Sequence, residues 1–323
     1  MPRKRKGDGD GIDEVPSKKA KRPPPRNRAS SSSLLVACKD MNDDRKAAID
    51  EMDFTSLRNI QCDHLFNNLS VWLADLYNPD SRVVVVQGRG RLPVNEKYVH
   101  HVMGVPHGGK DVPYNLPTEA DIELGLELFG KLRYAPKMTD LVYLIKGSVN
   151  ADDTFKRMWL LLASNRVIAP TTSNKVSPRC FFVFNLRRDI DGIKKLNWSI
   201  FIADELHKAL LKRKPTRGCL LFYNLLYIHA TDLSGLGIVL PDGPFPINVW
   251  TKKLITLVLN KDVQADKASF GKLPLKPEFG MNLCLFGGLE GLDIFMRVHV
   301  APSCSEEVCM YPGFYFHVIL CFL

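Results

Sequence analysis

The sequence predicts a mainly α-helical, multi-helix globular domain with one small β-hairpin, preceded by a disordered basic N-terminal tail. Two observations indicate the helical body. Hydrophobic residues make up 45% and charged residues 24% of the 323 residues, as in proteins with a substantial core. Apolar residues also recur at helical spacing from about residue 43 onward. The third observation is a single valine-rich stretch interrupted by glycine, which is typical of a hairpin.

The predicted tail spans residues 1–42, and its first 33 residues are poor in apolar side chains. Such a segment cannot bury enough surface to offset the entropy lost on ordering, so we expect it to be disordered. It carries ten Lys or Arg against four Asp or Glu, a net charge of +6. The chain as a whole carries +9, so the rest carries only +3 and is nearly neutral.

Two basic clusters in the tail, "PRKRK" (2–6) and "KKAKRPPPR" (18–26), have the spacing of a two-part nuclear localisation signal. An extended basic peptide of this kind suits the acidic, aromatic-lined groove of a nuclear import receptor. A general polyanion-binding arm is the alternative, and the two can coexist; both favour the nucleus. The predicted signal residues are Arg3, Lys4, Arg5, Lys6, Lys18, Lys19, Lys21 and Arg22.

Cysteine usage and apolar run lengths indicate a soluble protein of a reducing compartment. The eight cysteines form no C-x-x-C pair and are scattered through apolar segments, as reduced core thiols usually are. No run reaches the roughly 18 apolar residues that a membrane helix needs. We therefore expect no membrane association.

The body, residues 43–300, begins with helical patterns and then the hairpin. "DDRKAAIDEMDFTSL" has acidic residues in its first turn, and "HLFNNLSVWLADLY" places its leucines and Trp72 on one face before Asn78-Pro79 ends the helix. "SRVVVVQGRGRLPV" follows as two strands around a Gly-containing turn.

The next stretch, "NEKYVHHVMGVPHGG" (95–109), predicts a short helix. Asn95 is its N-cap, Gly104 its C-terminal cap, and Pro106 prevents continuation. Neighbours on a helix point about 100° apart, so His100 and His101 cannot easily share one metal ion. We expect a surface or half-buried structural pair and no metal site.

Six further segments predict helices, and one more segment is ambiguous. "PTEADIELGLELFGKL" carries a capping box from Thr118 to Asp121, and "NWSIFIADELHKALLKRKP" is capped by Asn197. The stretch "RCFFVFNL" is either a strand or an extended buried connector. The other helices are expected in "TDLVYLIKG", "ADDTFKRMWLLLASN", the fully apolar "RGCLLFYNLLYIHAT" and "PFPINVWTKKLITLVLN". The apolar segment 301–323 either packs as a final strand or marks a truncated or misread gene product, which we favour.

Three stretches together resemble the aminotransferase-like plant mobile domain. They are "LSVWLADLYNPDSRVVVVQGRGRLPVNEKYVHHVMGVPHGG", "FKRMWLLLASNRVIAPT" and "DIDGIKKLNWSIFIADELHKAL", in the family's order and spacing over roughly residues 60–265. Leu196 stands where the family commonly has an aromatic residue. The motif positions are Trp72, Gly88, Gly104, Pro106, Asn197 and Trp198.

The resemblance implies a plant nuclear protein linked to transposable elements, with roles in transposon silencing or genome maintenance and a phosphatase among its partners. It brings no established catalytic residues. The Schiff-base Lys, the acid and the phosphate cup of a pyridoxal-phosphate enzyme are not recognisable, so we expect no cofactor.

The chemical candidates each have a structural alternative. Arg89 and Arg91 in "GRGR" and Lys212 and Arg213 in "KRKPTR" could contact nucleic acid, but a solvated turn and a charged helix end explain them as well. Asp204, Glu205 and His207 suggest acid–base chemistry, yet such neighbours usually form the wet face of a helix. The four tryptophans, Trp72, Trp159, Trp198 and Trp250, are expected on apolar helices as core anchors.

The sequence therefore predicts a non-enzymatic nuclear interaction domain that acts through nuclear protein partners. The alternative is direct nucleic-acid binding by the basic tail and the two basic loops.

Overall fold

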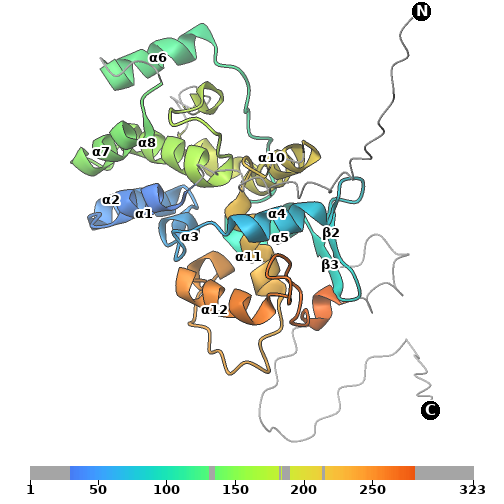
Figure 1. The fold of residues 1–323 in the computed structure, drawn as a ribbon. Helices are drawn as coiled ribbons and strands as arrows, with labels where there is room; N and C mark the ends of the chain where they lie inside the picture. Colours follow the sequence, from blue (N-terminus) through green and yellow to red (C-terminus); the bar gives the residue numbers. More distant parts are fainter. Residues whose placement is uncertain (1–29, 131–134, 182, 184–189, 213–214, 281–323) are drawn as a thin grey trace, which may run out of the picture. The chain divides into compact units, whose positions relative to one another are not determined.

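The computed structural model describes residues 30–130, 135–181, 183, 190–212 and 215–280 (Figure 1). These residues belong to the first of two units, which spans Met1–Leu283. The predicted nuclear localisation signal and the apolar segment 301–323 lie outside the described residues, as does Arg213.

The predicted mainly α-helical fold is confirmed. The three caps that the sequence predicts are present: Asn95, Thr118 and Asn197 each accept a backbone N–H three residues on, and Thr118 forms the full capping box with Asp121. The described α-helices are α1 (Ser32–Cys38), α2 (Asp43–Glu51), α3 (Thr55–Arg58), α4 (Asn67–Asp75), α5 (Glu96–Met103), α6 (Glu119–Phe129), α7 (Met138–Gly147), α8 (Asp153–Ala163), α10 (Trp198–Leu211), α11 (Leu220–Ala230) and α12 (Lys252–Asp262).

The predicted hairpin is also confirmed and gains a third strand. β2 (Val83–Val86) and β3 (Gly90–Pro93) pair antiparallel, and β1 (Tyr77–Asn78) pairs with the other edge of β2. The alternation of the strands places Val84, Val86 and Leu92 in the core. The extra strand is only two residues long and directly follows α4, which is why its helix-ending sequence gave no strand signal.

The folded part begins earlier than the predicted boundary at residue 43. α1 lies within the segment assigned to the tail, and Leu34 is fully buried. The hydroxyl of Ser31 is buried as well and donates a hydrogen bond of 2.6 Å to the carbonyl of Cys62. The serine run disguised this short helix, because only its apolar residues pack against the core.

Two other local predictions need correction. The strand alternative for "RCFFVFNL" is wrong at its start, because Pro178–Phe181 is a 3-10 helix with Cys180 and Phe181 buried. Trp250 is buried but precedes α12 and so does not lie on that helix; a 3-10 turn, Pro246–Asn248, comes before it.

Helix α11 is the centre of the core. Nearly all of its residues are buried, as its apolar sequence predicts, and it contacts α4, α5 and β3. α5 also packs against α10, while α1, α7 and α8 pack together (Figure 1). Trp159, Trp198 and Trp250 are fully or almost fully buried, whereas Trp72 is half-buried.

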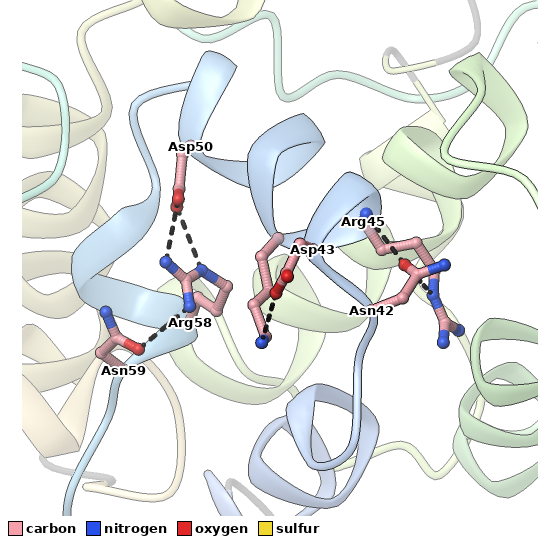
Figure 2. Close-up of polar contacts among 7 residues, drawn as sticks. Asn42, Asp43, Arg45, Asp50, Arg58 and Asn59 are labelled. Carbon is pink, nitrogen blue, oxygen red and sulfur yellow. Dashed lines mark hydrogen bonds and ion pairs between the residues drawn. The ribbon is translucent and has the colours of Figure 1, made fainter.

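Polar contacts hold α2 and α3 at a corner (Figure 2). Arg58 on α3 donates from Nε and Nη2 to the two carboxylate oxygens of Asp50 on α2, at 3.0 and 2.9 Å. Asn42 caps α2 by accepting the backbone N–H of Arg45, and the guanidinium of Arg45 also donates to the carbonyl of Ile145 on α7. These contacts fix the positions of α2, α3 and α7, and we assign them a structural role.

Candidate functional site

The stretch 95–109 forms a structural junction between α5 and α10. Gly104 ends α5 in the left-handed conformation with φ of 62°. The carbonyl of Pro106 then accepts the backbone N–H of Ser199 at 3.0 Å. Asn197 caps α10 and donates its Nδ2 to the carboxylate of Glu96 at 2.8 Å. Pro106 and Asn197 therefore hold α5 and α10 together.

The histidines of this stretch point in different directions, as the helical geometry predicts. His100 stacks on His107 with ring centroids 4.0 Å apart, and its Nδ1 hydrogen bonds with the carbonyl of Val105. His101 instead faces His229, with ring centroids 5.5 Å apart. Burial lowers the pKa of His229 to about 4, with a smaller contribution from Lys276. Among the described residues, no group of three or more His, Cys, Asp or Glu could hold a metal ion.

Arg89, predicted as a nucleic-acid contact, is directed into the protein. Its Nη1 donates to the hydroxyl of Tyr227 on α11 at 3.2 Å, and that hydroxyl donates to the carboxylate of Asp262 at 2.5 Å. Asp262 is fully buried and also accepts the backbone N–H groups of Gly271 and Leu273. Burial raises the pKa of Tyr227 well above its usual range. Arg89 thus anchors the hairpin turn to the core, and we withdraw it as a nucleic-acid contact.

The remaining predicted positions, in the hairpin and on two helices, are either exposed or packed against other residues. Arg91 is exposed on β3, opposite Val85. Gly88 adopts φ of 70° in the turn, with open space around it. Trp72 packs edge-on against Tyr227 with ring centroids 5.1 Å apart. Trp198 is buried and donates from Nε1 to the carbonyl of Ile193 at 2.8 Å.

The acidic and histidine side chains of α10 do not assemble an acid–base group. Each contacts a different partner, as expected for side chains on the solvent-exposed face of a helix. The three contacts are Asp204 with Arg82 at 2.6 Å, Glu205 with Lys208 at 2.9 Å, and His207 Nδ1 with the hydroxyl of Tyr77 at 2.7 Å.

A cationic pocket is the site that the structure adds to the sequence analysis. It has a volume of about 490 Å³ and forms where the last turns of α10 meet three other segments. We call it the cationic pocket and define it by its lining residues: Tyr114, Ala169, Pro170, Thr171, Ser177, Arg179, Glu205, Lys208, Ala209, Lys212, Arg217 and Gly218.

The charges of the cationic pocket are mostly positive. Four cationic side chains and one carboxylate leave a net charge of +3, and the carboxylate, Glu205, is paired with Lys208. Lys212 was predicted as a contact from the motif "KRKPTR", whereas Arg217, at the end of the same motif, was not. Arg179 and Lys208 were missed, because residues so far apart in the chain give no common spacing signal.

Hydroxyl groups complete the lining. Tyr114 is half-buried, and burial raises the pKa of its phenol far above neutrality, so the phenol stays protonated. The guanidinium of Arg179 lies over the Tyr114 ring, 5.9 Å from its centroid. Cations and protonated hydroxyls are hydrogen-bond donors, so the cationic pocket is suited to bind an anion.

Comparison with known proteins identifies one family. A family model described as "Domain of unknown function (DUF8566)" matches residues 27–223, which include α1–α8, the sheet, α10 and the start of α11. No curated protein and no solved structure matches the chain. Within the part of the chain that the structure describes, no helix is long and apolar enough to cross a membrane.

Proposed function

The chain belongs to the family described as "Domain of unknown function (DUF8566)", and from that premise we propose that it is a non-enzymatic nuclear interaction domain. Its partners are a nuclear import receptor, which binds the basic tail, and nuclear proteins that bind the folded body. An origin from a transposable element, a role in transposon silencing or genome maintenance and a phosphatase partner follow from the plant mobile domain resemblance alone and are part of the proposal.

The cationic pocket carries the proposal. Its described lining offers hydrogen-bond donors from several segments, and its one carboxylate is already ion-paired. Histidine is the commonest general acid or base in enzymes, and no histidine is among these lining residues, whose one carboxylate is ion-paired with Lys208. The pocket therefore supports recognition of an anionic group on a partner better than it supports turnover.

Two experiments with the full chain test this function. Changing the eight basic signal residues to Gln should abolish nuclear accumulation of a fluorescent fusion, because the import receptor reads their charges. The unaltered chain should retain the same protein partners from nuclear extract of its source with and without nuclease treatment, in a fixed ratio of partner to chain. Release of every retained protein by the nuclease would contradict the proposal, since nucleic acid would then have bridged them.

Direct nucleic-acid binding is the second candidate, favoured by the exposed Arg91, Lys212 and Arg217. It predicts that fluorescence anisotropy with duplex DNA gives a steep decrease in affinity as salt increases. The tail variant should lose most of this binding. If the tail variant binds DNA as tightly as the unaltered chain, with the same salt slope, the folded body is the DNA-binding part and the second candidate replaces the first.

A further inference from the structure

We propose that the cationic pocket binds a phosphate monoester on a phosphorylated segment of a nuclear partner protein, an inference that rests on the proposed function. The pocket carries a net charge of +3 from its lining side chains. A phosphorylated Ser or Thr brings about −1.5 to −2 charges and three acceptor oxygens at neutral pH. A single Asp or Glu side chain brings only one charge and leaves more of the positive charge unbalanced.

The cations of the pocket are not all explained by the helix on which they lie. Lys208 and Lys212 stand at the C-terminal end of α10, where the helix dipole favours positive charge. Arg179 and Arg217 come from two other segments. Among the described residues, neither has a carboxylate within ion-pair distance. Two arginines from distant segments line the same pocket, and its one carboxylate, Glu205, is paired with Lys208, which indicates a site for an external anion.

The donors around these cations suit a phosphate. Arginine presents a planar fork of N–H groups that matches phosphate oxygens in pairs. Thr171 and Ser177 are half-buried residues of the same lining, and each has a short side chain with a hydroxyl donor. Gly218 lies two residues before α11, so the positive end of that helix dipole is also near the pocket. The volume of about 490 Å³ leaves room for the phosphate and part of the peptide that carries it.

The arrangement favours a phosphomonoester over the backbone of a nucleic acid. A backbone presents singly charged diesters in a row, and proteins that follow it use a charged groove or stripe. Here Arg89 is directed into the core, and Arg91 is not among the pocket-lining residues. The four cations Arg179, Lys208, Lys212 and Arg217 thus line one pocket and do not extend to Arg91.

The test compares two doubly substituted full chains. Lys212→Gln with Arg217→Gln removes two charges from the pocket. Arg91→Gln with Lys253→Gln removes one arginine and one lysine from exposed positions outside it. All four residues are exposed, so both variants should fold, which circular dichroism will check. Arg179→Gln provides an independent pocket variant from another segment.

The probe is a fluorescein-labelled peptide library with a central phosphoserine and degenerate flanks, and the same library with serine. Anisotropy should show at least tenfold tighter binding of the phosphorylated library. The pocket variants should lose about tenfold or more, as expected for charge-assisted hydrogen bonds. The control variant should stay within about twofold of the unaltered chain. Equal binding of both libraries, or equal losses in pocket and control variants, would overturn the inference.

Further arms separate the sources of the phosphate and the two proposals. If duplex DNA binds and loses affinity only in the pocket variants, the pocket is a nucleic-acid site and the phosphoprotein assignment is overturned. If the pocket variants retain nuclear partners as well as the unaltered chain does, the inference fails while the proposed function stands. If inorganic phosphate competes with the phosphoserine library but no protein partner is retained, the pocket stands and the proposed function fails.

Discussion

Removing the carboxylate of Asp262 should strongly destabilise the fold. Asp262 is fully buried at the end of α12. It accepts the hydroxyl of Tyr227 at 2.5 Å and the backbone N–H groups of Gly271 and Leu273 at 3.1 and 2.8 Å. The guanidinium of Arg89 joins the same network through Tyr227. One side chain thereby connects α11, α12, the hairpin turn and the segment after α12.

The magnitude follows from these three hydrogen bonds. A hydrogen bond to a charged group contributes about 1.5 kcal/mol or more, and a buried donor left without a partner costs a similar amount. Asp262→Ala should therefore lower the free energy of unfolding by about 3–5 kcal/mol. Asp262→Asn keeps an acceptor of the same shape but loses the charge and turns an NH₂ toward a donor, so we expect about 2 kcal/mol.

Urea unfolding followed by tryptophan fluorescence measures both variants, with Asp242→Ala as the control at an exposed carboxylate. The control should stay within about 0.5 kcal/mol of the unaltered chain. A double-mutant cycle of Arg89→Met with Asp262→Asn should give a coupling energy of at least about 0.5 kcal/mol. If Asp262→Ala costs less than about 1 kcal/mol with an unchanged urea slope, or if the cycle shows no coupling, the network does not hold the hairpin and the argument is refuted.

Three further predictions concern stability. The folded pKa of His229, about 4, lies below its ordinary 6.5. The contribution of neutral His229 to the free energy of unfolding is therefore complete above about pH 6.5 and is lost as the pH falls through about 4. Unfolding at a series of pH values should show a loss of up to about 3 kcal/mol, and the His229→Leu variant should not show this loss. Gly104→Ala should cost about 2–3 kcal/mol in urea unfolding, because an added Cβ would approach the Phe245 ring to 2.3 Å at a positive φ, whereas Gly88→Ala, with nothing within 4 Å, should cost about 1 kcal/mol; equal costs would refute the clash. Asn197→Ala should cost about 1–2 kcal/mol of thermal stability by removing the α10 cap and the bond to Glu96, and an unchanged melting temperature would contradict that role.

The sequence alone predicted the parts of this protein that depend on near neighbours. The capping residues Asn95, Thr118 and Asn197, the left-handed Gly104 and the hairpin all depend on interactions within a few residues. The boundary at residue 43 failed for the opposite reason. α1 is a short helix stabilised by packing against α3, α7 and α8, which its own residues do not reveal.

The candidate site depended on contacts between distant residues. "GRGR" and "KRKPTR" looked alike as basic loops, but the tertiary structure separated them. Tyr227, 138 residues along the chain, turns Arg89 inward, because a buried phenol and carboxylate provide its acceptor network. Lys212 and Arg217 instead meet Arg179 around the cationic pocket. Side-chain direction and charge clustering are set by which segments the core brings together, so local patterns determined the elements, and only the packing decided which cations line one pocket.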